Sequence, residues 1–411
     1  MNEIQYIRDL AKEVYEFAVS PEMNRRRDLW RDHNSLIFSR PPIYIRKVPF
    51  YEYEEGINLK STDPYLRSIE YDLLYKLYLK RIKTDDTITE PYLTVRADVD
   101  VHPDGVFGVP AELEEKVGDV LCARYNPSIV EEEDIKKLCV LPYRVNEETT
   151  QKKLERLQEV LGGTLDVVVD RQAPLCGMWQ NDISTAIAKI RGLEQIMWDA
   201  YDRPEWLHEL LGYMRDRILE HIDQTEAKGG FRLCNHQNQA MPYCNELEDP
   251  SASDKPVSTK QLWGYMAAQE YTTFGPAQFD EFMFRYQKPI LERYGLTAYG
   301  CCEDLTHKID VIKTLNNLRR IAVSPFANVK KCAEQIGSDY VLSWRPNPSS
   351  ACSRGVDEDF VRGELRNVID ICNANNCKWD ITLKDLETTS GDTEAVIKWT
   401  KVIRDELEKH Y

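Results

Sequence analysis

From about residue 160 onward, short runs of β-branched and apolar residues alternate with long segments whose apolar residues recur at helical spacing. This alternation is typical of parallel strand and helix units. With a short run near residue 43 we count about eight apolar runs, the number that closes an α/β fold of the (β/α)8 TIM barrel type. The runs are Ile43–Ile45, Leu165–Val169, Pro174–Met178, Phe231–His236, Leu296–Cys301, Ile321–Val323, Tyr340–Leu342 and Trp379–Leu383.

The pattern also predicts how the rest of the chain is organised. Residues 1–85 read as helices broken at Arg40–Pro42, and we expect them to form an N-terminal helical extension packed on a barrel of residues 86–411, in a single structural domain. Helices are expected over Ile183–Ala200 and over Glu205–Lys228. The polar segment 239–260 lacks periodicity, so we expect a long loop that caps the barrel mouth.

Composition excludes several classes of protein. The chain has 411 residues and a formal net charge of −16, which argues against nucleic-acid binding because phosphate contacts need clustered Lys and Arg. We find no apolar run long enough to span a membrane and no signal peptide, so we expect a cytoplasmic protein. The eleven cysteines fit reduced thiols better than a disulfide framework. Most of them, including Cys122, Cys139, Cys332 and Cys372, are expected to be small buried residues.

The most informative chemistry lies in the segment Tyr299–Asp304, where two adjacent cysteines and two acids follow an apolar run. Barrels place their chemistry at the carboxyl ends of their strands. Thiolates and a carboxylate crowded at such an end can hold a thiophilic metal such as zinc. The alternative is a structural pair, Cys301 and Cys302, next to a helix that begins at Asp304.

Three other strand ends carry polar residues that indicate a pocket. His236 ends one predicted strand and is followed by Gln237, so its imidazole is a candidate ligand or proton carrier. Arg345, with Asn347 close behind it, and Lys384 follow the last two predicted strands, and we expect them to hold an anionic substrate group. Structural hydrogen bonds for His236 and surface ion pairs for Arg345 and Lys384 remain the alternatives.

Four segments of the chain resemble the methyltransferase-like branch of the uroporphyrinogen decarboxylase superfamily. They are Arg191–Glu194, Tyr201–Glu205, Tyr299–Asp304 and Arg345–Pro348. The resemblance implies a TIM barrel over most of the chain. It also implies kinship with zinc-dependent methyltransferases that act on corrinoid proteins or coenzyme M.

The chain departs from that family at the expected metal site. Tyr299 or Gly300 stands where the histidine of the family's His-x-Cys pair belongs, and Lys384 or Asp385 stands near its last-strand cysteine. The Arg-rich N-terminal segment of the porphyrin decarboxylases is missing as well, which disfavours tetrapyrrole substrates. The zinc ligands that we predict instead are Cys301, Glu303 and His236, with Cys302 as a substitute.

These observations lead to three hypotheses. In the first, the protein moves a methyl group between a small methylated substrate and a corrinoid protein or thiol acceptor, with metal assistance and with His236 and Glu303 as catalytic residues. Arg345, Asn347, Lys384 and Gln237 would then bind the substrate. Any corrinoid would arrive on a separate partner protein, because the D-x-H-x-x-G match at residues 100–105 lacks the expected domain context.

The second hypothesis is a metal-free decarboxylase of a small or tetrapyrrole-like acid, with His236 as the acid and Arg345 and Lys384 as an electrostatic clamp. The third is a barrel that binds a small molecule without catalysis. The sequence does not decide between a monomer and a homodimer.

Overall fold

We describe a computed structural model of the chain, which defines residues 2–37, 39–113 and 125–411. Its centre is a six-stranded sheet in which every neighbouring pair of strands is parallel. In spatial order the strands are β1 (Ile43–Ile45), β10 (Lys378–Leu383), β9 (Val341–Trp344), β8 (Leu318–Val323), β7 (Leu296–Tyr299) and β6 (Trp263–Met266). Because the strands are parallel, their carboxyl ends meet at one edge of the sheet.

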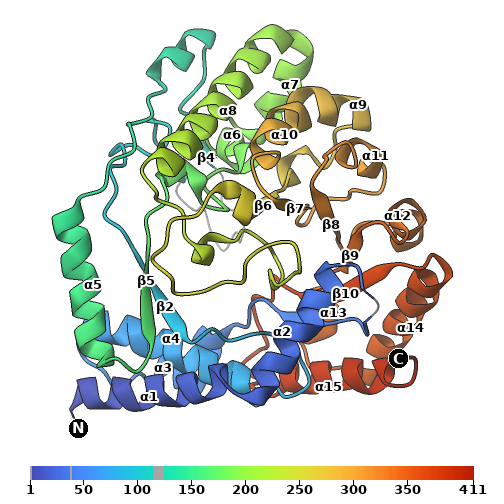
Figure 1. Cartoon of the computed structure of the whole chain (residues 1–411). Helices are drawn as coiled ribbons and strands as arrows, with labels where there is room; N and C mark the ends of the chain where they lie inside the picture. The colour runs from blue at the N-terminus through green and yellow to red at the C-terminus, as the bar shows by residue number, and fades with distance from the viewer. Residues whose placement is uncertain (1, 38, 114–124) are drawn as a thin grey trace.

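The sheet is curled but does not close into the predicted barrel of eight strands. Two further strands, β2 (Tyr92–Arg96) and β5 (Asp166–Asp170), pair only with each other among the described residues and lie apart from the main sheet (Figure 1). A short antiparallel pair is formed by β3 (Glu112–Leu113) and β4 (Tyr125–Asn126). The fold is therefore a curled parallel α/β sheet rather than a closed TIM barrel.

Two of the predicted strands form 3-10 turns instead. Residues Pro174–Cys176 make one turn and Leu233–Asn235 make another. Pro174 has no backbone N–H that could donate a hydrogen bond to a neighbouring strand. In the second turn, the side chain of Asn235 accepts a hydrogen bond from the Arg232 N–H at 2.8 Å, so a local contact replaces a strand partner. The strands β2 and β6 and the short pair β3 and β4 are present although the pattern did not predict them.

The helical predictions are confirmed, with one division. The segment predicted over residues 183–200 contains two helices, α6 (Ile183–Arg191) and α7 (Leu193–Asp202), because Gly192 between them has a φ of +89°. The next helix, α8, spans Pro204–Ala227. The other longer helices are α5 (Glu147–Leu161), α10 (Arg285–Leu291), α12 (Val329–Ile336), α14 (Glu358–Ala374) and α15 (Ala395–Leu407). Short helices are α3 (Glu54–Ile57), α9 (Pro276–Phe279), α11 (Ile309–Ile312) and α13 (Pro348–Ala351).

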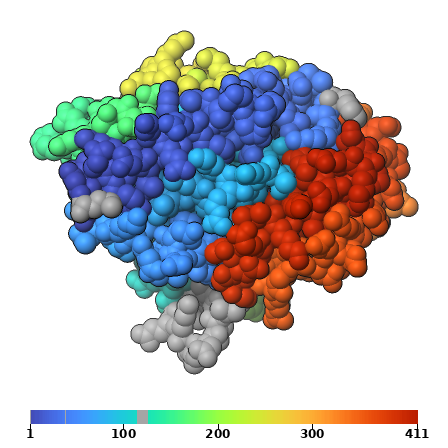
Figure 2. Space-filling model, turned by 90° about the horizontal axis from the view of Figure 1, so that it is seen from below, coloured from blue at the N-terminus to red at the C-terminus, as the bar shows by residue number. Residues whose placement is uncertain are grey.

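The N-terminal residues are mostly helical, as predicted. Helices α1 (Glu3–Ala18) and α4 (Pro64–Arg81) pack with α5 around a small apolar core of their own. Seen from below, the N-terminal helices lie beside the C-terminal ones (Figure 2), where Arg404 donates to the carbonyl of Thr84 at 2.8 Å.

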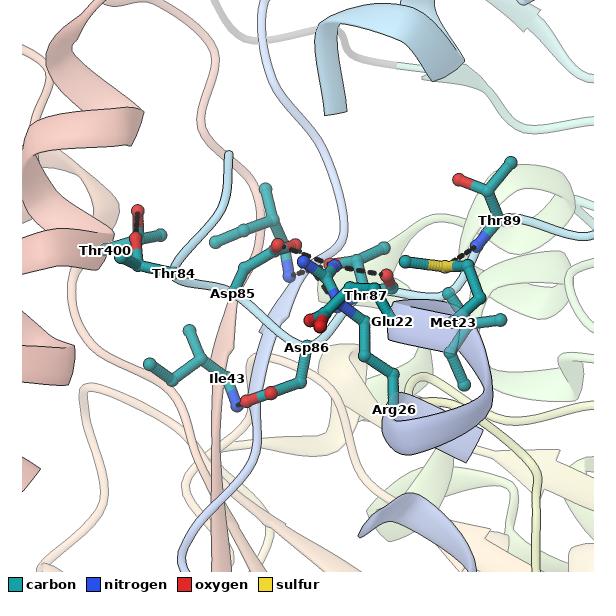
Figure 3. Close-up of polar contacts among 12 residues, drawn as sticks. Glu22, Met23, Arg26, Ile43, Thr84, Asp85, Asp86, Thr87, Thr89 and Thr400 are labelled. Atoms are coloured by element: carbon teal, nitrogen blue, oxygen red, sulfur yellow. Dashed lines mark hydrogen bonds and ion pairs between the residues drawn. The ribbon is translucent and has the colours of Figure 1, made fainter. Parts of the chain in front are cut away.

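A buried ion pair and two hydrogen bonds connect α2 (Pro21–Asn34) to the first strand of the sheet. Arg26 donates to the carboxylate of Asp85 at 2.8 Å and to the carbonyl of Thr87 at 2.7 Å (Figure 3). The neighbouring Asp86 accepts from the backbone N–H of Ile43 at 2.8 Å (Figure 3). The segment that follows α4 therefore joins α2 to β1.

The long polar segment does not lie where the sequence suggested. We expected residues 239–260 to cap the mouth of a barrel, but Asn34 of α2 donates to the carbonyls of Met241 and Tyr243, both at 2.8 Å. The same helix contacts the amino-terminal half of β10, because His33 lies 3.1 Å from Asp380. Residues 241–243 of the loop are thus held against α2, whereas its first residue, Gln239, reaches the carboxyl end of β7, where its amide nitrogen lies 3.4 Å from Cys301 Sγ.

Two other expectations concerned the burial of the cysteines and the absence of a membrane-spanning segment. Cys332 and Cys372 are buried as predicted, Cys139 is exposed, and Cys122 lies outside the described residues. All ten cysteines in the described part of the chain are free thiols. None of the described helices is both long and apolar enough to cross a membrane.

Candidate functional site

The two adjacent cysteines stand directly after β7, on a sharp turn that only glycine fits. Gly300 has a φ of +99°, and a Cβ built there would lie 2.6 Å from a methyl carbon of Leu305. Both the backbone conformation and the packing therefore require glycine. The turn directs Cys301 and Cys302 toward Lys384 at the end of β10.

Lys384 and the two sulfurs form the centre of the site. The ammonium nitrogen of Lys384 lies 2.7 Å from Cys301 Sγ and 3.1 Å from Cys302 Sγ, and the two sulfurs are 3.7 Å apart. Asp385 completes the arrangement, since its carboxylate is 2.9 Å from the ammonium and 3.0 Å from Cys302 Sγ. Lys384 and Cys301 are buried, whereas Cys302 is partly exposed.

This arrangement favours one thiolate, on Cys301. A hydrogen bond from the Cys302 thiol, together with the positive charges of Arg345 and Lys384, holds the pKa of Cys301 well below its usual range, although burial opposes the shift. The same sulfur–sulfur contact raises the pKa of Cys302, and burial adds to that increase. Because a thiolate rather than a thiol is the nucleophile, Cys301 is the reactive member of the pair.

Arg345 holds the loop that carries the thiolate. Its guanidinium donates to the carbonyl of Cys301 at 2.5 Å, and the side chain is buried. The Nε atom of Arg345 is buried and has no hydrogen-bond partner within the described part of the chain. Gln239 reaches the sulfur from another direction, because its amide nitrogen lies 3.4 Å from Cys301 Sγ.

Glu303 is next to the thiolate in sequence but faces the backbone. Its two carboxylate oxygens accept hydrogen bonds from the N–H groups of Ala268 and Cys301, each at 2.8 Å. Burial raises the pKa of this carboxyl, while the backbone donors oppose that shift. Glu303 therefore fixes the backbone of Cys301, and both of its carboxylate oxygens are already engaged in hydrogen bonds.

His236 is not brought to the cysteines. Its Nε2 atom lies 3.0 Å from the carbonyl of Glu248, and its Nδ1 accepts from the N–H of Trp263 at 3.2 Å. Trp263 is the first residue of β6 and pairs with the first residue of β7, so His236 lies about a strand length, roughly 10 Å, from the turn at Cys301. Burial lowers the pKa of this imidazole to about 4.

Two predicted substrate-binding residues have structural partners instead. The amide of Gln237 donates to the carbonyl of Cys176 at 2.5 Å and accepts from Asn181 at 3.2 Å. Asn347 is exposed and caps α13, because its side chain accepts from the Ser349 N–H at 3.0 Å. Of the predicted residues, Cys301, Cys302, Arg345 and Lys384 come together.

A cavity of about 430 Å³ opens over the cysteine pair. Its wall carries two cations and one carboxylate: Arg46 and Lys47 directly follow β1, Asp385 lies just after β10, and Lys47 is paired with Glu387 at 2.7 Å. The guanidinium of Arg46 lies 5.1 Å from the ring centroid of Trp179. The lining residues are Arg46, Lys47, Trp179, Gln269, Cys301, Cys302 and Asp385. Arg46 and Lys47 end a predicted strand, so the sequence predicts their position at the carboxyl edge of the sheet. No pattern in the sequence predicted that Trp179 and Gln269 would line the same cavity.

The predicted zinc ligands are not assembled. Across residues 2–37, 39–113 and 125–411, no group of three or more His, Cys, Asp or Glu side chains is arranged to hold a metal ion. The position between the two sulfurs is taken by the Lys384 ammonium, 2.7 Å from one and 3.1 Å from the other. A fixed cation in this place repels a metal cation, so the residues present do not fit the predicted zinc set.

Comparisons with known proteins find similarity among solved structures. No family model and no curated protein matches the sequence. Among solved structures, the chain is similar to a methyltransferase from Methanosarcina mazei with a TM-score of 0.47 and 10% sequence identity, over 94% of this chain and 98% of that one. The resemblance to the uroporphyrinogen decarboxylase superfamily therefore rests on the sequence motifs alone.

Proposed function

We propose that the protein is a transferase that moves a methyl group from a small anionic methylated compound, with the Cys301 thiolate as the nucleophile. The observation that carries this proposal is the contact of 2.7 Å between Lys384 Nζ and Cys301 Sγ beneath a cavity whose lining includes the guanidinium of Arg46. A nearby cation keeps a thiol ionised, and an ionised thiol is a strong nucleophile at neutral pH.

In the first step, Cys301 Sγ attacks the methyl carbon. A sulfur–carbon bond forms, and the bond from that carbon to oxygen, nitrogen or sulfur breaks, leaving its electron pair on the departing atom. The loop does not need to move for this step, because Glu303 and Arg345 already fix the backbone of Cys301. Such pre-organisation lowers the cost of reaching the reactive geometry.

The cavity supports a small acid as the substrate. Arg46 and Lys47 line it, and a guanidinium binds a carboxylate through two parallel hydrogen bonds. The indole of Trp179 lies beside Arg46 and offers an apolar surface for the remainder of such a molecule. A volume of about 430 Å³ suits a small ligand rather than a tetrapyrrole.

The second step returns the enzyme to its starting state. An acceptor, either a corrinoid protein or a thiol, attacks the methyl carbon on Cys301, and the thiolate leaves with its electron pair. Lys384 and Arg345 stabilise the negative charge that returns to the sulfur. This reaction sequence agrees with the resemblance to the methyltransferase-like branch of the uroporphyrinogen decarboxylase superfamily, which is part of the proposal.

The position of His236 counts against the decarboxylase alternative in the form stated above. Decarboxylation needs a proton donor beside the carbon that loses CO₂. His236, the residue expected to be that donor, is bonded to the backbone near the start of β6 and does not line the cavity. No other residue of the cavity wall was expected to supply the proton.

Mass spectrometry of the reduced protein tests the proposal. The protein is incubated with small carboxylates that carry an O-, N- or S-methyl group, and tryptic peptide 294–308 is examined. We expect a methyl group on Cys301 in the wild type and in Cys332→Ser, which alters a buried thiol elsewhere, and none in Cys301→Ser. Turnover of a methylated acid by Cys301→Ser would contradict the role of the thiolate, and no methylation or turnover with any compound would favour a binding protein.

A further inference from the structure

The same cluster has the composition and the spacing of an oxidative cross-link site. We propose that dioxygen joins Cys301 to Lys384 through a single oxygen atom, giving a reversible Sγ–O–Nζ bridge that switches the thiolate off. This inference does not depend on methyl transfer, because it needs only the two side chains and an oxidant.

Distance selects Lys384 as the partner of the oxidised sulfur. Its nitrogen is 2.7 Å from Cys301 Sγ, a separation that one bridging oxygen spans without movement of either residue. The competing partner, Cys302, is 3.7 Å away and adjacent in the chain through a trans peptide. Neighbouring Cα atoms across such a peptide are about 3.8 Å apart, below the usual range for a disulfide, so that ring would be strained.

Atoms and electrons balance for this reaction. The Cys301 thiolate and the Lys384 ammonium together contribute three hydrogens, of which one stays on the bridging nitrogen and two leave with the second oxygen as water. The oxygen–oxygen bond breaks, and one sulfur–oxygen bond and one nitrogen–oxygen bond form. Sulfur and nitrogen each lose two electrons, which together reduce both atoms of dioxygen.

Access and reactivity also favour oxidation at this position. Cys301 and Cys302 both line the cavity of about 430 Å³, so a small oxidant reaches them from solvent. A low-pKa thiolate near solvent is the kind of cysteine that is oxidised first. The bridge would consume the nucleophile and the cation beside it in a single event, so Cys301 of the oxidised protein would no longer react with electrophiles.

A tryptic digest of the full chain, without substrate, tests the bridge. After exposure to air, we expect peptides 294–308 and 379–398 to be joined, because trypsin cannot cut after a blocked Lys384. The joined mass should equal the sum of the two peptides plus one oxygen minus two hydrogens, and excess dithiothreitol should restore cleavage at Lys384. Peptide 332–354, which carries the buried Cys332 and Cys352, serves as an unmodified reference in the same digest.

Three matched variants assign the bridge. It should persist in Cys302→Ser and disappear in Cys301→Ser and in Lys384→Arg, which keeps the positive charge but removes the amine. The proposal is overturned if air leaves both wild-type peptides separate, if peptide 294–308 alone loses two hydrogens as a disulfide, or if the link survives in Cys301→Ser. A link without the extra oxygen would also overturn it. Because the digest requires no methylated compound, its result is independent of the test of methyl transfer.

Discussion

Two clusters of buried charge lie along the same strands and differ in how their charges are satisfied. In the first, which we call the Asp380 cluster, the carboxylate of Asp380 accepts from Arg320 at 2.7 Å and Ser343 at 2.9 Å, and lies 3.1 Å from both His33 and Thr382. Every partner comes from the protein itself. This cluster joins α2 to β8, β9 and β10, which is a structural role.

The second, which we call the thiolate cluster, consists of Cys301, Cys302, Arg345 and Lys384. Lys384 lies four residues after Asp380, just past the end of β10, and Cys301 and Cys302 line a cavity. Arg345 Nε is buried without a hydrogen-bond partner among the described residues. The comparison teaches that burial of charge does not identify a site. A reactive group that lines a cavity beside buried cations, as Cys301 does, is the better indication of one.

Removing the central carboxylate should have the largest effect on stability. Asp380→Ala leaves the Arg320 guanidinium buried without its counter-ion, so we expect the free energy of unfolding to fall by about 3–5 kcal/mol. Urea denaturation followed by circular dichroism measures this loss. Lys384→Met is the matched variant and should cost less, because Cys301 can take up a proton once the cation is gone. Equal losses in the two variants would contradict the distinction between the clusters.

The second-largest effect on stability is expected from acid, which should weaken the Asp380 cluster. The pKa of Asp380 is lowered to about 2, because Arg320 and His33 outweigh the effect of burial. A lowered carboxyl pKa contributes stability that is present above the unfolded value and is lost as pH falls toward 2. We expect roughly 2 kcal/mol to disappear between about pH 4 and pH 2. The variant Asp380→Asn, denatured in urea over the same interval, should show a shallower decline.

Reactivity should change most in the thiolate cluster. Wild-type Cys301 should be alkylated by iodoacetamide well below the ordinary thiol pKa of about 8.5, since Lys384 and Arg345 favour the thiolate. At pH 6, Lys384→Met should slow alkylation of peptide 294–308 about tenfold for each unit by which the raised Cys301 pKa exceeds 6. Lys384→Arg should retain most of the wild-type rate. A rate unaffected by Lys384→Met would mean that the lysine does not hold the charge of the sulfur.

The smallest effect is expected at His236, which belongs to neither cluster. His236→Leu removes its hydrogen bonds to Trp263 and Glu248 and should lower the free energy of unfolding by about 1 kcal/mol. The alkylation rate of Cys301 should stay at the wild-type value, measured in the same digest. A large decrease in that rate would place the imidazole closer to the thiolate than the structure does.

Much of the fold was accessible from local pattern. The runs at Ile43, Leu296 and Trp379 are strands, and the helix that begins at Pro204 ends before Gly229 as expected. The strand β6 was missed because Gly264 interrupts its apolar run, directly behind a polar loop. Closure of a barrel could not be predicted by counting runs, because the turn around Asn235 depends on a side-chain contact that competes with strand pairing.

The sequence by itself determined which residues follow a strand, and therefore that the cysteine pair, Arg345 and Lys384 lie at one edge of the sheet. Only the tertiary structure decided which of them touch. The pairing of β10 with β9, and the turn at Gly300, bring Lys384 between two sulfurs more than eighty positions earlier in the chain, where a metal had been expected. His236 carried an equally suggestive local pattern but was held at the start of β6. Contact across strands depends on register, loop direction and depth along the strand, and none of these is encoded in the local pattern of polar and apolar residues.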